Sequence, residues 1–278
     1  MSTDNAKTDT PINLYGAMAG PGPEMAGPTG SVGPLTSDWR PFRTSRVLLT
    51  LLIPLAVLVA INVALLTAIH YSSAAAYPAL AHWYSAFDNN AEHNVPSWYN
   101  AALWMLTGLV SGYLARHTDS RRGSWRLFSG ICFFFSLDET VSIHERLEPL
   151  GRWLESHLPF HLAFAWVIPG VIIAGLIVAV LLPWLFSLPP RTRNWLLIGG
   201  IVFILGSVGI ETITGMVFQD VGANGVFGLL STVEETFEMT GISICIAALL
   251  MLVRYQRAGD ITSYRVDTTK NADSAAHR

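Results

Sequence analysis

Long apolar segments recur along this chain and constrain its fold more than any other feature. Each has about the length that an α-helix needs to cross the hydrocarbon core of a membrane, roughly 20 residues. The composition agrees, because 51% of the 278 residues are hydrophobic and only 13% are charged. We therefore predict an all-α, polytopic membrane protein, a bundle of six transmembrane helices. The predicted spans are residues 47–69, 97–115, 124–144, 161–186, 195–217 and 226–253.

The two ends of the chain differ in composition from the segments between them. Residues 1–45 are rich in Gly, Pro, Ser and Thr, and residues 254–278 are mostly polar. Such segments cannot bury enough apolar surface to offset the entropy lost on folding. We predict that both are disordered cytoplasmic tails around a six-helix domain at residues 46–253.

The distribution of arginine residues predicts the orientation of the spans, because cytoplasmic flanks carry the excess of Lys and Arg. If the N-terminus is cytoplasmic, the outer flanks hold only Arg146 and Arg152. The inner flanks hold Arg40, Arg43, Arg46, Arg116, Arg121, Arg122, Arg126, Arg191, Arg193, Arg254 and Arg257. We predict cytoplasmic N- and C-termini and a multi-pass location in the cell (plasma) membrane.

Three predicted spans carry carboxylates where contacts with hydrocarbon are expected. The stretch SLDETVSIHE ends the third span, ETITG lies in the fifth, and TVEETFE lies in the sixth. Counted along each helix from its cytoplasmic end, Asp138 and Glu139 lie about 18 to 20 Å deep. Glu211 lies about 26 Å and Glu238 about 24 Å from the same side. Acids from three helices thus reach the same outer half of the bilayer.

These acids need a positive partner, because an unpaired acid in a span costs about 2.5 to 3.5 kcal/mol at the centre of a helix. No Lys or Arg lies near them within the spans, so protons, a metal ion or a cationic substrate must supply the charge. As an alternative, acids near a helix end can reach the lipid headgroups without any partner. This explains Glu145 and Glu234, but it explains the deeper acids poorly. Carboxylates with an imidazole suit iron, manganese or zinc.

We predict an outward-facing site for a divalent metal ion between the third, fifth and sixth spans. The expected ligands are Asp138, Glu139, Glu211, Glu235 and Glu238, followed by Glu234, Glu145 and His144. His144 points about 120° away from Asp138 in a continuous helix, so it joins the site only if the third span unwinds near its end. Thr140, Ser142, Thr212 and Thr236 can orient the carboxylates or bond to their own helix backbone.

Three functions fit this site. The first is a metal-binding protein, or a metal-dependent membrane enzyme that acts on a lipid-soluble substrate from the outer leaflet. The second is proton-coupled transport of a metal or organic cation, although the inner halves of the spans offer no ionisable group. The third is an accessory or sensory protein without catalysis.

The remaining sequence features limit the classes of partner and of chemistry that this chain can be expected to have. The lipid bilayer is an expected partner, and no basic patch with interleaved aromatic residues indicates nucleic acid. Cys132 and Cys245 lie in apolar runs and form no metal-binding or disulfide pattern. No glycine-rich phosphate loop and no Ser-His-Asp set is present.

Overall fold

A computed structural model describes residues 39–258 and 261–268 of the chain. The chain divides into two units, residues 1–37 and 38–278, and all described residues lie in the second. The predicted disorder of residues 1–38 and 269–278 therefore falls outside the described residues. The described part is mostly helical, as predicted.

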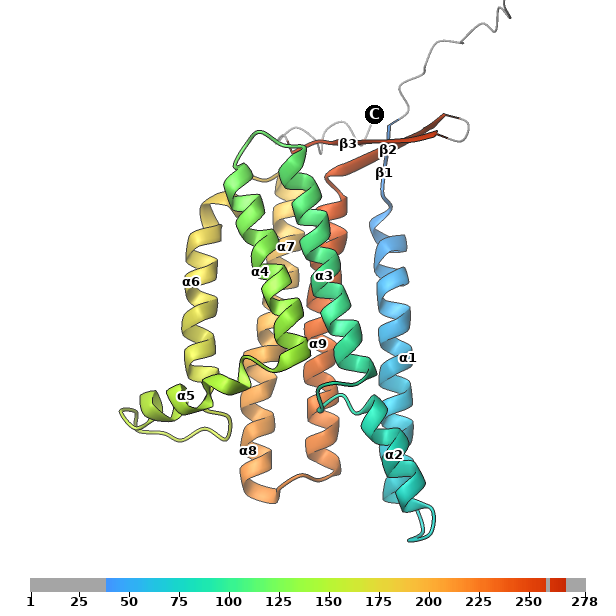
Figure 1. The fold of residues 1–278 in the computed structure, drawn as a ribbon, viewed down its shortest axis with the longest axis vertical. Coiled ribbons are helices and arrows are strands. Elements are labelled where there is room, and N and C mark those ends of the chain that lie inside the picture. Colours follow the sequence, from blue (N-terminus) through green and yellow to red (C-terminus); the bar gives the residue numbers. More distant parts are fainter. Residues whose placement is uncertain (1–38, 259–260, 269–278) are drawn as a thin grey trace, which may run out of the picture. The chain divides into compact units, whose positions relative to one another are not determined.

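Each of the six predicted segments is helical in the structure (Figure 1). They form α1 (Thr44–His70), α3 (Val95–Arg116), α4 (Arg122–Val141), α6 (Val167–Leu185), the joined α7 (Pro190–Ile204), η2 (Leu205–Ile210) and α8 (Glu211–Val221), and α9 (Gly225–Leu250). Shorter helices connect them: α2 (Tyr77–Phe87), η1 (Glu145–Leu147) and α5 (Glu148–Glu155). The fourth segment was expected to begin at residue 161, but its helix begins at Val167.

Within residues 39–258 and 261–268, three helices are long and apolar enough to cross a membrane: Thr44–His70, Val167–Leu185 and the continuous Pro190–Val221. They have 27, 19 and 32 residues, and most of their surface is not buried inside the protein. Helices α4 and α9 are not among these three, because each carries several charged side chains, including acids, within its length. The structure thus supports a membrane protein with three helices that can cross a membrane. The prediction of six spans is not tested by these three helices.

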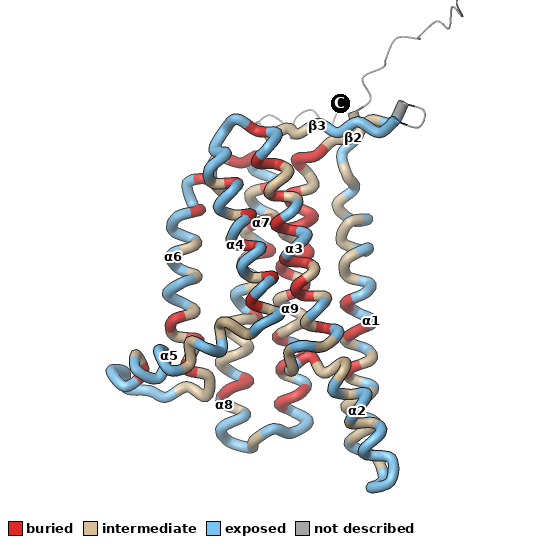
Figure 2. Tube along the Cα trace, in the orientation of Figure 1, coloured by how far each residue is buried: buried red, intermediate tan, exposed pale blue. Residues whose placement is uncertain are grey.

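Helix α9 lies at the centre of the bundle and contributes many of its buried residues (Figure 2). Toward one end, Trp125 of α4 packs edge-on against Trp184 of α6, with ring centroids 4.8 Å apart. Further along, Met239 and Ile242 of α9 form a second buried cluster with Leu103 of α3. The two clusters hold the middle of the bundle together and leave the polar side chains of α9 near its other end.

Glycine residues bring α7 and α9 into close contact. A Cβ atom at Gly241 would lie 2.6 Å from the carbonyl oxygen of Gly199, and one at Gly206 would lie 2.9 Å from that of Glu234. Small residues of this kind let helices in a membrane approach until their backbones touch. The same approach places Glu234 and Glu238 of α9 directly against η2.

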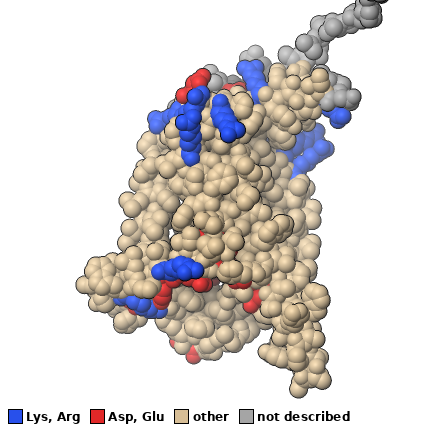
Figure 3. Space-filling model, viewed as in Figure 1, with Lys and Arg blue, Asp and Glu red and all other residues tan. Residues whose placement is uncertain are grey.

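The segment after α9 corrects the prediction of a disordered tail from residue 254. Strands β2 (Val253–Ala258) and β3 (Ile261–Val266) form an antiparallel hairpin, and β1 (Arg40–Pro41) pairs with β2. The run ITSYRV is rich in β-branched and aromatic residues, which favour strands. Val253 is buried in the adjoining core, so the sheet is anchored to the bundle. On the face drawn in Figure 3, most of the basic side chains lie at this end, and most of the acidic ones lie toward the other end, where some basic side chains accompany them.

Candidate functional site

Glu92 lies in the loop between α2 and α3, and hydrogen bonds hold both ends of this loop. The Tyr84 hydroxyl donates to the Asp88 carboxylate at 3.0 Å. Asn94 caps α3 by accepting from the Ser97 backbone N–H at 3.1 Å, and the Ser97 hydroxyl accepts from the Asn94 N–H at 3.0 Å. This reciprocal capping arrangement fixes where α3 begins and therefore where the loop ends.

The middle of the loop is tied to α9. The Ser231 hydroxyl of α9 donates to the Asn90 side-chain oxygen at 2.8 Å. His93, directly before the cap, adopts a left-handed conformation with φ of 63°. As a result the Glu92 side chain turns inward, and its Oε2 atom is buried without a hydrogen-bond partner among the described residues.

His144 is presented by the end of α4. The helix stops at Val141 because Ser142 turns left-handed, with φ of 52°, while its N–H still donates to the Asp138 carbonyl at 2.8 Å. The turn brings His144 back over the helix, where the Asp138 carboxylate accepts its backbone N–H at 2.8 Å and contacts its Nδ1 at 3.0 Å. The third predicted span therefore unwinds, which was the condition for His144 to join the site.

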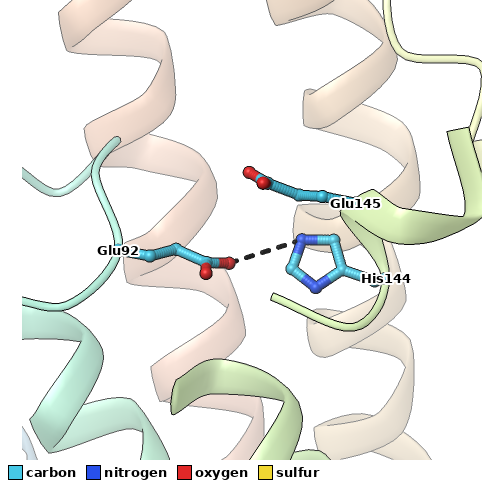
Figure 4. Close-up of side chains that lie close together, drawn as sticks. All are labelled: Glu92, His144 and Glu145. Atoms are coloured by element: carbon cyan, nitrogen blue, oxygen red, sulfur yellow. Dashed lines mark ion pairs between the residues drawn. The ribbon is translucent and has the colours of Figure 1, made fainter. Parts of the chain in front are cut away.

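The His144 ring has a defined orientation. Since a carboxylate only accepts, Nδ1 donates to Asp138, and in the neutral ring the free lone pair is on Nε2. The Trp166 ring packs against the imidazole, with centroids 4.6 Å apart. The Nε2 atom then lies 3.6 Å from Oε1 of Glu92 (Figure 4).

Glu92, His144 and Glu145 form a group that could hold a metal ion, because one ligand atom from each lies within 4.8 Å of the others. In Figure 4 Glu92 enters from the α2–α3 loop, and His144 and Glu145 enter from the opposite side. Two ligands bound tetrahedrally at about 2.1 Å are separated by roughly 3.4 Å, close to the 3.6 Å between His144 and Glu92. Glu145 is exposed and free to close the remaining distance.

The chemistry of these three groups also fits a metal. The buried Oε2 of Glu92 lacks a partner, and the fixed imidazole offers Nε2. A carboxylate that holds the far nitrogen of a ligating histidine is a common feature of metal sites. Burial raises the pKa of Glu92 to about 7; His144 opposes this rise, and Glu145 and Asp138 add to it. A cation at this position would offset the free-energy cost of ionising the buried Glu92 carboxyl group.

Further carboxylates continue from this group into the bundle. Glu139 of α4 interacts electrostatically with Glu92, and Glu235 of α9 interacts with Glu139, His144 and Glu92. Glu238, one turn deeper on α9, interacts with Glu235 and Glu139. The acids of the third and sixth predicted spans therefore face one another.

Asn100 of α3 lies beside these acids and contacts Glu139. Its side chain is fully buried. Neither its amide nitrogen nor its amide oxygen has a hydrogen-bond partner of regular geometry among the described residues.

Glu211 joins the cluster through a local distortion of its helix. The six residues of η2 form a π-helix that ends at Ile210, directly before Glu211. Such insertions change the direction of the side chains that follow and are frequent at functional sites. Glu211 interacts electrostatically with Glu234, Glu235 and Glu238 of α9.

The structure thus brings the predicted acids and His144 toward one region but divides their roles. Asp138, expected as a ligand, has both oxygens on His144. Glu92 was not predicted, because it lies in a polar loop outside every apolar run. Its one signal is its place in a short loop that faces the same outer side. The hydroxyls of Thr140, Thr212 and Thr236 bond to carbonyls of their own helices.

The helices and this acidic group define a helical membrane protein with a candidate metal-binding site. The chain belongs to a family described as a domain of unknown function, DUF8692, whose model matches residues 49–253. That range extends from α1 to the start of β2 and includes every candidate site residue. No curated protein and no solved structure matches the chain.

Proposed function

We propose that the protein is a multi-pass protein of the cell membrane with six spans and cytoplasmic termini. Helices α3, α4 and α9 would cross the membrane beside the three apolar helices, since they run alongside them in the same bundle (Figure 1). The clustering of basic side chains at the end that carries the β-sheet supports this orientation.

The function that the site supports best is the binding of a divalent metal ion, such as iron, manganese or zinc, by Glu92, His144 and Glu145. The observation that carries this proposal is the pair of contacts around the His144 ring. Asp138 occupies Nδ1 at 3.0 Å, and Glu92 lies 3.6 Å from Nε2. A mixed set of imidazole and carboxylate ligands suits these metals.

Three protein ligands leave coordination positions open, which is the arrangement of catalytic metal sites. A bound ion would activate water or polarise an oxygen of a lipid-soluble substrate. The chain's own residues would then divide the remaining work. Asp138 and Trp166 keep the imidazole in place, and Glu139 and Glu235 add negative charge that acts on the group.

Elemental analysis of the detergent-purified protein tests this proposal. We expect about one metal ion per chain, and a loss of most of it in Glu92→Gln and His144→Ala. His157→Ala is the matched control, because His157 is an exposed histidine whose ring contacts only nearby groups of its own segment. Native protein without metal, or variants that retain it fully, would refute the proposal.

A second candidate is proton-coupled transport of a cation, and the row of carboxylates that continues behind the metal-binding group favours it. Glu139, Glu235 and Glu238 lead from Glu92 toward the middle of the bundle. Acids at membrane depth are typical of carriers. In proteoliposomes, cation uptake that depends on a pH gradient and is lost in Glu235→Gln would favour transport, and metal binding without uptake would exclude it.

A further inference from the structure

A cavity of about 450 Å³ lies beside the metal-binding group. Its lining residues are His93, Val141, Ser142, Glu145 and Arg146. The volume falls in the range of sites for small molecules, about 300 to 1,000 Å³. Glu145 belongs both to this cavity and to the metal-binding group, so a molecule in the cavity would touch that group.

The backbone around the cavity is strained. In the described part of the chain, the non-glycine residues with positive φ are His93, Arg121 and Ser142, and two of these three line the cavity. A left-handed conformation costs a non-glycine residue about 1 kcal/mol or more, and such residues gather at binding and active sites. The two strained turns come from different segments, the α2–α3 loop and the end of α4, yet they meet at the same wall.

Arg146 lines the cavity with a positive charge that forms no ion pair with the described residues. No carboxylate of the described chain lies within ion-pair distance of it. By contrast, Arg152 of α5 pairs with Glu148 and Glu155 at 2.6 and 3.0 Å. An arginine without such a partner, at the wall of a cavity, suits a carboxylate or phosphate group of a ligand.

An apolar surface leads from the cavity along α4. Phe134, Leu137 and Val141 lie on successive turns of one helix face, and the first two are 50% and 52% exposed. This face belongs to a helix of the proposed membrane domain, so it can contact an acyl chain. The cavity therefore combines a site for an anionic group with a path for an apolar tail.

We propose that this cavity binds the anionic headgroup of an amphiphile, with Arg146 as its ionic partner and the apolar face of α4 against its tail. The anion site stands on the cavity and on Arg146 alone. Its role as the substrate site of the metal-binding group rests on the proposed function. A metal ion on Glu145 would remove a negative charge from the cavity wall and tighten the binding of the anion.

Equilibrium binding of a fluorescent phosphatidylglycerol to the detergent-solubilised full chain tests the proposal. We expect Arg146→Gln to weaken binding about tenfold, as expected for the loss of one charge-assisted contact. Arg126→Gln should leave binding unchanged, because Arg126 is an exposed arginine near the opposite end of α4. Fluorescent phosphatidylcholine should bind less tightly than phosphatidylglycerol. Equal binding by native protein and Arg146→Gln would overturn the proposal.

Two further arms separate the sources of the anion and the two proposals. Inorganic phosphate should compete only weakly with phosphatidylglycerol, and Leu137→Gln should weaken phosphatidylglycerol binding. If phosphate competes strongly and Leu137→Gln has no effect, the ligand is a small anion and the proposal of an amphiphile is wrong. The lipid titration is repeated with Zn²⁺ present. Tighter binding with Zn²⁺ supports both proposals. Unchanged binding contradicts a metal at Glu145 but leaves the anion site supported by the Arg146→Gln result.

Discussion

The Asp138→Asn variant tests whether Asp138 prepares His144 to bind a metal. The carboxylate accepts the His144 backbone N–H at 2.8 Å and contacts Nδ1 at 3.0 Å. A proton on Nδ1 leaves Nε2, the atom 3.6 Å from Glu92, as a free ligand. An asparagine keeps the size of the side chain, but its amide can donate to Nδ1. The imidazole proton then moves to Nε2, where it blocks the metal.

The structure sets the size of the expected effect. Loss of a carboxylate that orients a ligating histidine typically weakens metal binding by about 10- to 100-fold, or roughly 1.4 to 2.7 kcal/mol. The backbone contact survives, because the asparagine oxygen still accepts the His144 N–H. We therefore expect weaker metal binding with an intact fold.

Titration of metal-stripped protein with Zn²⁺ against a chromophoric chelator measures this affinity, and thermal unfolding checks the fold. Asp119→Asn is the matched control, since that carboxylate pairs with Arg122 at the opposite end of α4 at 2.9 Å. If Asp138→Asn bound Zn²⁺ as tightly as the native protein, the assigned role of Asp138 would be wrong.

Three further predictions follow from the fold and the site. Gly206→Ala should lower the free energy of unfolding by about 1 to 3 kcal/mol, because its Cβ would lie 2.9 Å from the Glu234 carbonyl oxygen, whereas Gly200→Ala meets no atom within 4 Å and should not destabilise the protein in the same thermal unfolding assay. Metal affinity should fall at least tenfold per pH unit below pH 7, since Glu92 with a pKa of about 7 must lose its proton to bind and the His144 ring must be neutral as well; an affinity that is constant from pH 7 to 5.5 in the chelator titration would contradict this. Ser142→Gly should raise the unfolding temperature and Ser142→Val should lower it, because φ is 52° at this position; equal unfolding temperatures would show that the turn carries no strain.

The helices were predictable because the length and apolar content of a segment are local properties of the sequence. All six predicted segments are helical, and three are long and apolar enough to cross a membrane. The ends were less predictable. The left-handed turn at Ser142 ends α4 three residues early, and the hairpin after Leu252 pairs with residues near Arg40, far away in the sequence. Both depend on contacts that periodicity does not describe.

The candidate site was predictable in its chemistry and only partly in its members. Acids in apolar helices indicate a shared polar cluster, because each alone would be costly. Glu92 could not be selected, since its loop is one of several polar loops and only the Ser231–Asn90 contact places it on α9. The role of Asp138 also depended on a turn that brings His144 back over the helix.

By itself the sequence determined a helical, membrane-type chain with buried acids on its third, fifth and sixth long segments, because hydrophobicity and helical spacing act within each segment. The tertiary structure decided which acids meet, which one orients the histidine, and that Glu92 completes the group. The physical reason is that contacts between segments depend on loop paths and on how closely helices approach. Here the glycine contacts determine how closely α7 approaches α9, and the unwound end of α4 determines the path of the loop that carries His144.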